Sequence, residues 1–172
     1  MPNTSTPNTA GAHGHGAWAE VRARDQVVRY HRSGVGRTVL ILCSHNDPEP
    51  LWPELLETLG AGYRLIVPEP PVDETDLVSW LADFLEGLGV SNVIILAANR
   101  FCIPALELAL LEGDQVARLV LVPQGNGRAG EAAATLVTQT RQARVPLLIV
   151  PRGQPASETV SVITGFLGET GR

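Results

Sequence analysis

Short apolar segments with the pattern of buried strands alternate with helical segments along most of the chain. The segment Thr38 to Cys43 is an unbroken aliphatic and β-branched run, which is typical of a strand covered on both faces. Residues 74–88 instead carry apolar side chains at three-and-four spacing, which indicates an amphipathic helix. The pattern predicts further strands at 63–67, 93–96, 117–122 and 146–150, with helices at 52–59, 105–112, 131–142 and 158–167. This alternation predicts a mostly parallel sheet with helices on both faces, and the strand at 38–43 is expected near its middle.

An antiparallel hairpin is predicted before this alternation begins. From Trp18 to Arg32 apolar and charged residues largely alternate, and Asp25-Gln26 divides the segment into two halves. The expected fold is therefore a three-layer α/β domain over residues 18–172, with a sheet of about seven strands. Residues 1–17 are small, polar and rich in turn formers, so we expect a disordered tail there.

Composition and charge argue against several classes of partner. The 172 residues, 44% of them apolar, carry a net charge of −5 without a long run of either sign, which speaks against nucleic acid binding. No apolar stretch approaches the ~18 residues that a membrane-spanning helix requires. Cys43 and Cys102 lie in apolar surroundings, as reduced thiols do, so a cytoplasmic location without a disulfide is expected.

No segment has the pattern of a cofactor or metal site. Gly34-Val35-Gly36 precedes a strand instead of following one, so it does not match a dinucleotide-binding or P-loop motif. His13 and His15 are two weak metal ligands in the tail and do not complete a site. The sequence therefore predicts neither a cofactor nor a metal.

Residues 93–110 have the pattern of a buried strand, a tight turn and a helix. Together with the order of strands and helices, this segment resembles the α/β-hydrolase superfamily over roughly residues 18–168. In that family the nucleophilic serine lies at the turn between strand and helix, with a positive φ and small residues on either side. The same register in this chain gives Ala97-Ala98-Asn99-Arg100-Phe101, with asparagine in the place of the nucleophile.

The turn is expected to persist in an altered form. Asparagine tolerates a left-handed backbone better than other residues with a side chain, so Asn99 suits the apex. Phe101 is bulky where the family has a small residue, which predicts a shifted helix or a relaxed turn. Pro104 fits only in the first turn of the helix, because a later proline would remove a hydrogen bond.

Other parts of a serine hydrolase are also missing from the sequence. An asparagine amide has no proton that a histidine could remove, so Asn99 cannot act as a serine-type nucleophile. No carboxylate follows the strand at 147–150 before Glu158, and no histidine follows His45. Only residues 123–144 separate two strands where the family often has a helical lid. The resemblance therefore implies a member that has lost both the catalytic triad and the cap.

The candidate site lies beyond the carboxyl ends of the parallel strands, where open α/β sheets bind ligands. His45 is the candidate general acid or base, with Asp47 near it in sequence. Arginines that follow different strands could together bind a carboxylate or a phosphate. The residues predicted to bind the ligand are Ser44, Asn46, Asn99, Arg100, Asn126 and Arg152. The alternative interpretation is that the histidine bonds only to backbone and that the arginines lie on the surface, paired with acidic residues.

Three functions are open at this point. The first is a non-hydrolytic protein that binds a small polar or anionic molecule and promotes a cyclisation, an epimerisation or an elimination. The second is an active hydrolase of esterase or thioesterase type with an atypical nucleophile, Cys43 or Ser44, assisted by His45. The third is an accessory or scaffold subunit whose exposed face is closed by a second copy of the chain, as in a homodimer, or by another protein.

Overall fold

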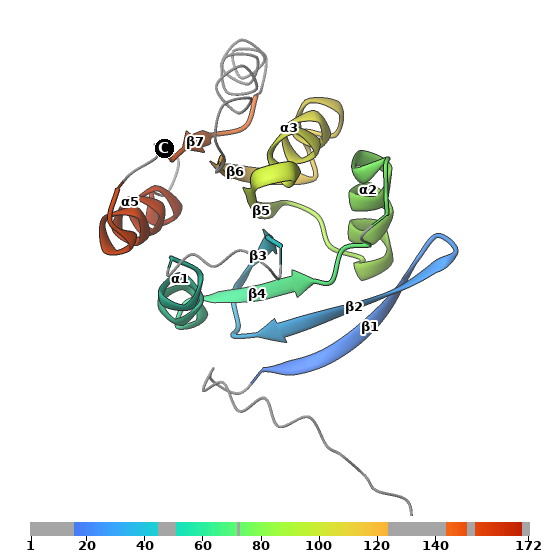
Figure 1. Cartoon of the computed structure of the whole chain (residues 1–172), viewed down its shortest axis with the longest axis horizontal. Helices are drawn as coiled ribbons and strands as arrows, with labels where there is room; N and C mark the ends of the chain where they lie inside the picture. The colour runs from blue at the N-terminus through green and yellow to red at the C-terminus, as the bar shows by residue number, and fades with distance from the viewer. Residues whose placement is uncertain (1–15, 45–50, 72, 124–143, 151–153, 170–172) are drawn as a thin grey trace, which may run out of the picture.

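The computed structural model describes residues 16–44, 51–71, 73–123, 144–150 and 154–169, which form a seven-stranded sheet flanked by helices (Figure 1). The strands are β1 (Ala17–Ala23), β2 (Gln26–Ser33), β3 (Arg37–Leu42), β4 (Tyr63–Pro68), β5 (Val93–Ala98), β6 (Val116–Val122) and β7 (Leu147–Ile149). The helices are α1 (Leu51–Gly60), α2 (Leu77–Leu88), α3 (Cys102–Leu111) and α5 (Ala156–Gly168), with a 3-10 turn η1 (Asn99–Phe101) before α3. The helix predicted at 131–142 and residues 1–15 of the predicted tail lie outside the described residues.

The sheet has the strand order β1-β2-β4-β3-β5-β6-β7. Strands β3 to β7 run parallel to one another, and β1 and β2 form the predicted antiparallel hairpin at one edge. β3 lies between β4 and β5, which confirms the prediction that it is a central strand. Its residues from Val39 to Leu42 are buried because helices cover both faces of the sheet at this position.

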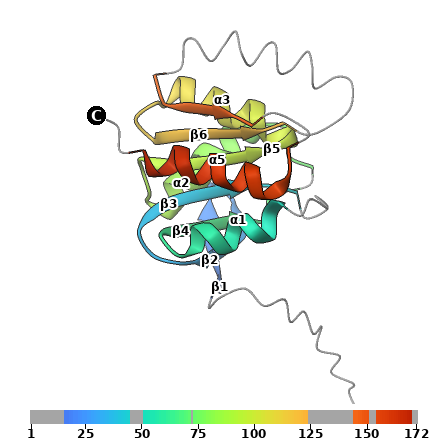
Figure 2. The same cartoon turned by 90° about the vertical axis from the view of Figure 1, so that its left-hand side faces the viewer.

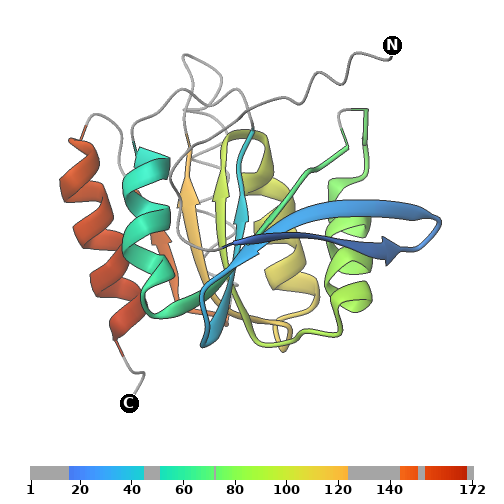
Figure 3. The same cartoon turned by 90° about the horizontal axis from the view of Figure 1, so that it is seen from below.

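The helices form two layers, as predicted. Figures 2 and 3 show α1 and α5 side by side on one face of the sheet, and α2 and α3 on the other. The core beneath α2 and α3 includes Trp80, Phe84 and Leu106, and the opposite core includes Trp52 and Ile163. The rings of Trp80 and Phe84 are both buried and stack with centroids 5.5 Å apart within this core.

Two helices begin three residues away from their predicted starts. α2 begins at Leu77 instead of residue 74, because the carboxylate of Asp76 accepts a hydrogen bond from the backbone N–H of Ser79 at 3.1 Å and caps the helix there. Hydrogen bonds from Ser79 lower the pKa of Asp76, since they stabilise its charged form. α3 begins at Cys102 instead of residue 105, and this start places Pro104 in the first turn, where its missing N–H costs no hydrogen bond.

Candidate functional site

A single residue with a left-handed backbone joins β5 to the helical segment that follows. β5 is buried from Val93 to Ala98, and Ala98 is still extended, with φ −118° and ψ 150°. Asn99 then has φ +52°, and η1 and α3 follow directly. A left-handed backbone costs a residue with a side chain about 1–2 kcal/mol, so it persists only where the surrounding structure fixes it. The strand, the tight turn and the helix implied by the resemblance are therefore present, with Asn99 at the apex of the turn. This turn after β5 is called the elbow below.

Phe101 is accommodated without loss of the elbow. Its side chain is only 2% exposed and belongs to the core between the sheet and the helices α2 and α3. The guanidinium of Arg100 lies over its ring, 4.9 Å from the centroid. The turn is altered in that η1 precedes α3, while the positive φ at Asn99 is kept. The ring of this large residue is therefore buried in the core that α2 and α3 cover.

Neighbouring strands bring Ser44 and Asn99 to the same edge of the sheet. Leu42 of β3 pairs with Ala97 of β5, so Ser44 and Asn99 each lie two residues beyond this pair. The end of β6 is level with them, since Val122 pairs with Ala98. Ser44 is exposed and Asn99 is half-buried. A hydroxyl and a carboxamide therefore follow the carboxyl ends of neighbouring strands, at the edge where this class of sheet binds ligands.

Arg100 links the elbow to the segment that follows β4. Its Nη2 donates a hydrogen bond to the carbonyl oxygen of Pro71 at 3.2 Å. β4 lies next to β3 on the side away from β5, so this contact spans the candidate site from one strand end to another. The sequence predicted that Arg100 lies at this edge. It did not predict the partner of Arg100, because a backbone carbonyl leaves no signal in the sequence.

The binding and catalytic roles of all the predicted site residues stay predictions. His45, Asn46, Asn126 and Arg152 lie outside the described residues. The structure therefore places Ser44, Asn99 and Arg100 at the carboxyl ends of neighbouring strands and leaves the proposed acid–base histidine untested.

The thiol of Cys102 has the environment of a buried core group. Its Sγ donates a hydrogen bond to the carbonyl oxygen of Ala97 at 3.4 Å, beneath the elbow. Burial removes the thiolate from water and raises the pKa of Cys102 to about 12, although the backbone of Val122 opposes this shift with a hydrogen bond. A thiol with such a pKa stays protonated near neutral pH and is a poor nucleophile.

Two tryptophans have buried indole N–H groups that the sequence did not predict to have polar roles. The indole Nε1 atoms of Trp52 and Trp80 are buried and have no hydrogen-bond partner among the residues that the structure describes. Trp52 is the second residue of α1, the helix that follows β3, so it lies towards the carboxyl edge of the sheet. Apolar spacing places such residues in the core, and the sequence carries no sign of an unsatisfied indole N–H.

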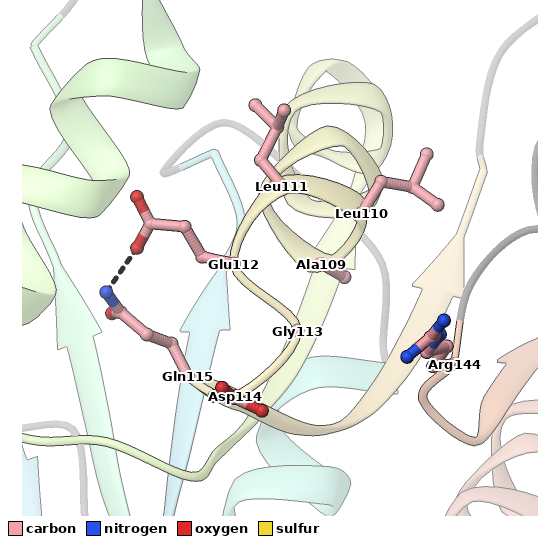
Figure 4. Close-up of a pocket in the computed structure, with 8 residues that line it drawn as sticks. All are labelled: Ala109, Leu110, Leu111, Glu112, Gly113, Asp114, Gln115 and Arg144. Atoms are coloured by element: carbon pink, nitrogen blue, oxygen red, sulfur yellow. Dashed lines mark hydrogen bonds between the residues drawn. The ribbon is translucent and has the colours of Figure 1, made fainter.

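Two cavities lined by described residues lie at the opposite, amino edge of the parallel strands. One, of about 630 Å³, lies where α3 ends and the chain enters β6 (Figure 4). Arg144 lines it together with Glu112 and Asp114, so charges of both signs are present. The other, of about 550 Å³, lies between β2, β4 and the end of α2. Neither cavity contains a residue of the predicted site.

The described residues offer no preformed metal cluster. They contain no group of three or more His, Cys, Asp or Glu side chains placed to hold a metal ion. None of the helices described has both the length and the apolar character that crossing a membrane requires.

Comparison with known proteins connects the chain to others through its fold. No protein-family model and no curated protein matches its sequence. Potato (Solanum tuberosum) epoxide hydrolase I matches in structure with a TM-score of 0.53 and 20% identity, over 63% of this chain and 40% of that chain. Epoxide hydrolase VrEH1 from Vigna radiata matches with a TM-score of 0.53 and 19% identity, over 70% and 46%. A protein from Acinetobacter baumannii proposed to be a lipase matches with a TM-score of 0.55 and 19% identity, over 66% and 43%.

The chain spans less than half the length of these three proteins. What it shares with them is the fold, a mostly parallel sheet with an N-terminal antiparallel hairpin and flanking helices. The hairpin, the mostly parallel sheet and the left-handed elbow after β5 together give this chain the α/β-hydrolase fold.

Proposed function

We propose that this protein binds a small polar or anionic molecule at the elbow and does not hydrolyse it through a covalent intermediate. The observation that carries the proposal is the asparagine at the apex of the elbow, with φ +52°. In the α/β-hydrolase fold this apex presents the nucleophile. A carboxamide has no proton that a base removes near neutral pH, so no ester intermediate can form on Asn99. It can instead donate and accept hydrogen bonds, which suits a binding role.

The proposed ligand is polar or anionic because of the groups at this edge. Ser44, Asn99 and Arg100 bring a hydroxyl, a carboxamide and a guanidinium to neighbouring strand ends. We place His45, Asn46, Asn126 and Arg152 in the same set, because each follows a strand of the parallel sheet in sequence. Fixed donors and a histidine that exchanges a proton can promote a cyclisation, an epimerisation or an elimination without a covalent step.

The structural neighbours support the scaffold of this proposal. Two are named as epoxide hydrolases and one is proposed to be a lipase, so the fold is one on which hydrolytic sites are built. Function depends on the residues at the site and not on the fold. The loss of the triad and of the cap, the small-molecule partner and the cytoplasmic location are therefore parts of the proposal.

Covalent labelling tests the absence of a serine nucleophile. We expect that the purified protein incubated with a fluorophosphonate probe shows no adduct by intact-mass spectrometry, because Asn99 carries no nucleophilic oxygen. Ser44 is the residue whose labelling would contradict the proposal, since it is exposed and level with Asn99 at the strand ends. An adduct mapped to Ser44 and abolished by Ser44→Ala would establish the atypical hydrolase instead.

Ligand retention tests the binding role of Asn99, and the chain provides a matched control. Asn92 also has a positive φ, +55°, but it is exposed and precedes β5, at the opposite end of the same strand. Glycine keeps the left-handed backbone at either position and removes only the carboxamide. Native mass spectrometry is expected to find a small molecule retained by the wild type and by Asn92→Gly, and lost from Asn99→Gly. Equal retention by both variants would exclude Asn99 from the binding site.

A further inference from the structure

The cavity of about 550 Å³ at the amino edge of the sheet has the size of a ligand site and lies away from the elbow. Ligand pockets commonly have volumes of about 300–1,000 Å³. Its walls come from the strands β1, β2 and β4, the end of α2 and the turn after it. The lining side chains in these elements are Ala17, Tyr30, Arg32, Arg64, Ile66, Leu88 and Val90. Ser33 at the end of β2, with Gly34 and Val35 of the turn into β3, completes the rim.

Two arginines lie on the sheet face that forms the floor of this cavity. Arg32 of β2 pairs with Ile66 of β4, and Arg64 lies two residues before Ile66 on the same strand. Side chains two residues apart on a strand share a face, so Arg32 and Arg64 are diagonal neighbours on one surface. Such neighbours are about 7–8 Å apart, within reach of the two long side chains.

Arg32 and Arg64 lie next to the buried apolar part of this sheet face, where the exposed part begins. Along β2 the residues on this face are Val28, which is buried, Tyr30, which is half-buried, and then Arg32, which is exposed. Along β4 the same change runs from the buried Ile66 to the exposed Arg64. α2 covers the apolar part and ends at Leu88, so the guanidinium groups lie beyond the end of the helix.

Neither arginine has an ionic partner among the described residues. The ion pairs of this part of the molecule engage other arginines of the hairpin, Arg24 with Asp83 at 3.0 Å and Arg29 with Glu69 at 3.8 Å. None of the described residues that line the cavity is an aspartate or a glutamate. Two like charges on adjacent strands repel each other, and an anion between them would convert this repulsion into attraction. The pair stands out in a chain whose net charge is −5.

Most of the other lining side chains are apolar. Ile66, Leu88 and Val90 line the cavity beside the guanidinium groups, and Val35 at the rim is 77% exposed. Apolar side chains next to two guanidinium groups suit a ligand that has both a hydrocarbon part and a negative charge. The ring of Tyr30 is fixed on one side by an edge-to-face contact with Phe84, with centroids 6.0 Å apart, so this wall is preformed.

We propose that this cavity binds an amphiphilic carboxylate, with Arg32 and Arg64 holding the carboxylate and Ile66, Leu88 and Val90 contacting its hydrocarbon part. A guanidinium binds a carboxylate with paired, charge-assisted hydrogen bonds, and the hydrocarbon part gains from leaving water. This site is independent of the elbow, because the two lie at opposite edges of the sheet and share no residue.

Isothermal titration calorimetry with octanoate tests the proposal. Acetate probes the carboxylate-binding part of the site alone, and 1-octanol probes the hydrocarbon-binding part alone. The full chain at low salt is expected to bind octanoate saturably at one site. Its affinity for acetate and for 1-octanol is expected to be lower by roughly tenfold or more. The double variant Arg32→Gln, Arg64→Gln is expected to weaken octanoate binding by roughly tenfold or more. Raising the salt concentration should also weaken it, since both arginines are exposed.

A second double variant controls for the change in net charge. Arg22→Gln with Arg37→Gln removes the same two charges from exposed positions that do not line the cavity, and is expected to bind octanoate like the wild type. Circular dichroism would show that both double variants are folded. Three results would each overturn the proposal: no saturable binding of octanoate by the wild type, equal affinity for octanoate in the two double variants, or equal affinity of the wild type for 1-octanol and octanoate.

Discussion

Replacing Phe101 by alanine is expected to lower the free energy of unfolding by about 3–5 kcal/mol. The phenylalanine side chain is 2% exposed and fills the core between β5, α2 and α3, so its removal leaves a cavity as well as losing the transfer free energy of the ring. Phe101 also ends η1, the turn that carries the chain from Asn99 into α3. The same substitution should therefore loosen the elbow.

Urea denaturation followed by circular dichroism measures this loss. Ile103→Ala is a suitable control, because Ile103 lies two residues further along and is 41% exposed, so its truncation is expected to cost far less. Phe101→Leu should fall between the two, since leucine refills part of the volume. A loss below about 1 kcal/mol for Phe101→Ala would show that the ring is not an essential part of the core.

Replacing Arg118 by methionine is expected to lower the free energy of unfolding by roughly 2 kcal/mol. The loss of stability should be concentrated in α5. Arg118 lies on β6 and is 6% exposed. Its Nη1 donates a hydrogen bond to the carbonyl oxygen of Phe166 at 2.7 Å, and its Nη2 donates to the carbonyl oxygen of Glu169. These carbonyls end α5, where the helix dipole places partial negative charge, so a cation is favourable there.

Methionine preserves most of the volume of the side chain but leaves the two carbonyl oxygens without this donor. Part of the loss is offset because the variant no longer buries a charge. Amide hydrogen exchange is the informative measurement, since the last turn of α5 should lose protection before the sheet does. Arg118→Lys keeps the charge but not the planar fork that reaches both carbonyls, so an intermediate loss is expected. Unchanged protection of α5 in Arg118→Met would show that packing alone holds the helix to the sheet.

The layer architecture could be predicted from the sequence because burial determines it. β3 and β5 are covered on both faces, and their unbroken apolar runs record that environment residue by residue. The amphipathic spacing of α2 similarly records which of its sides faces the sheet. The starts of the helices were harder to predict. α2 begins where the side chain of Asp76 caps it, and capping depends on local geometry.

The candidate site was predictable only in part. Asn99 could be identified because the register of strand and helix marks the apex, and asparagine was known to suit a left-handed backbone. The contact between Arg100 and the carbonyl oxygen of Pro71 was not, because it joins two strand ends that are distant in sequence. The arginine pair of the second cavity was missed for the same reason, since Arg32 and Arg64 meet only through the register of β2 with β4.

By itself, the sequence determined that this chain folds into a parallel sheet between helices and that no serine occupies the elbow, because apolar periodicity and side-chain identity are local properties. The tertiary structure alone decided that Asn99 adopts a positive φ and that Phe101 is buried beneath it. It also decided which arginines lie side by side. The physical reason is that a strained backbone and neighbouring charges are maintained by packing and strand pairing between distant segments, which no single stretch of sequence records.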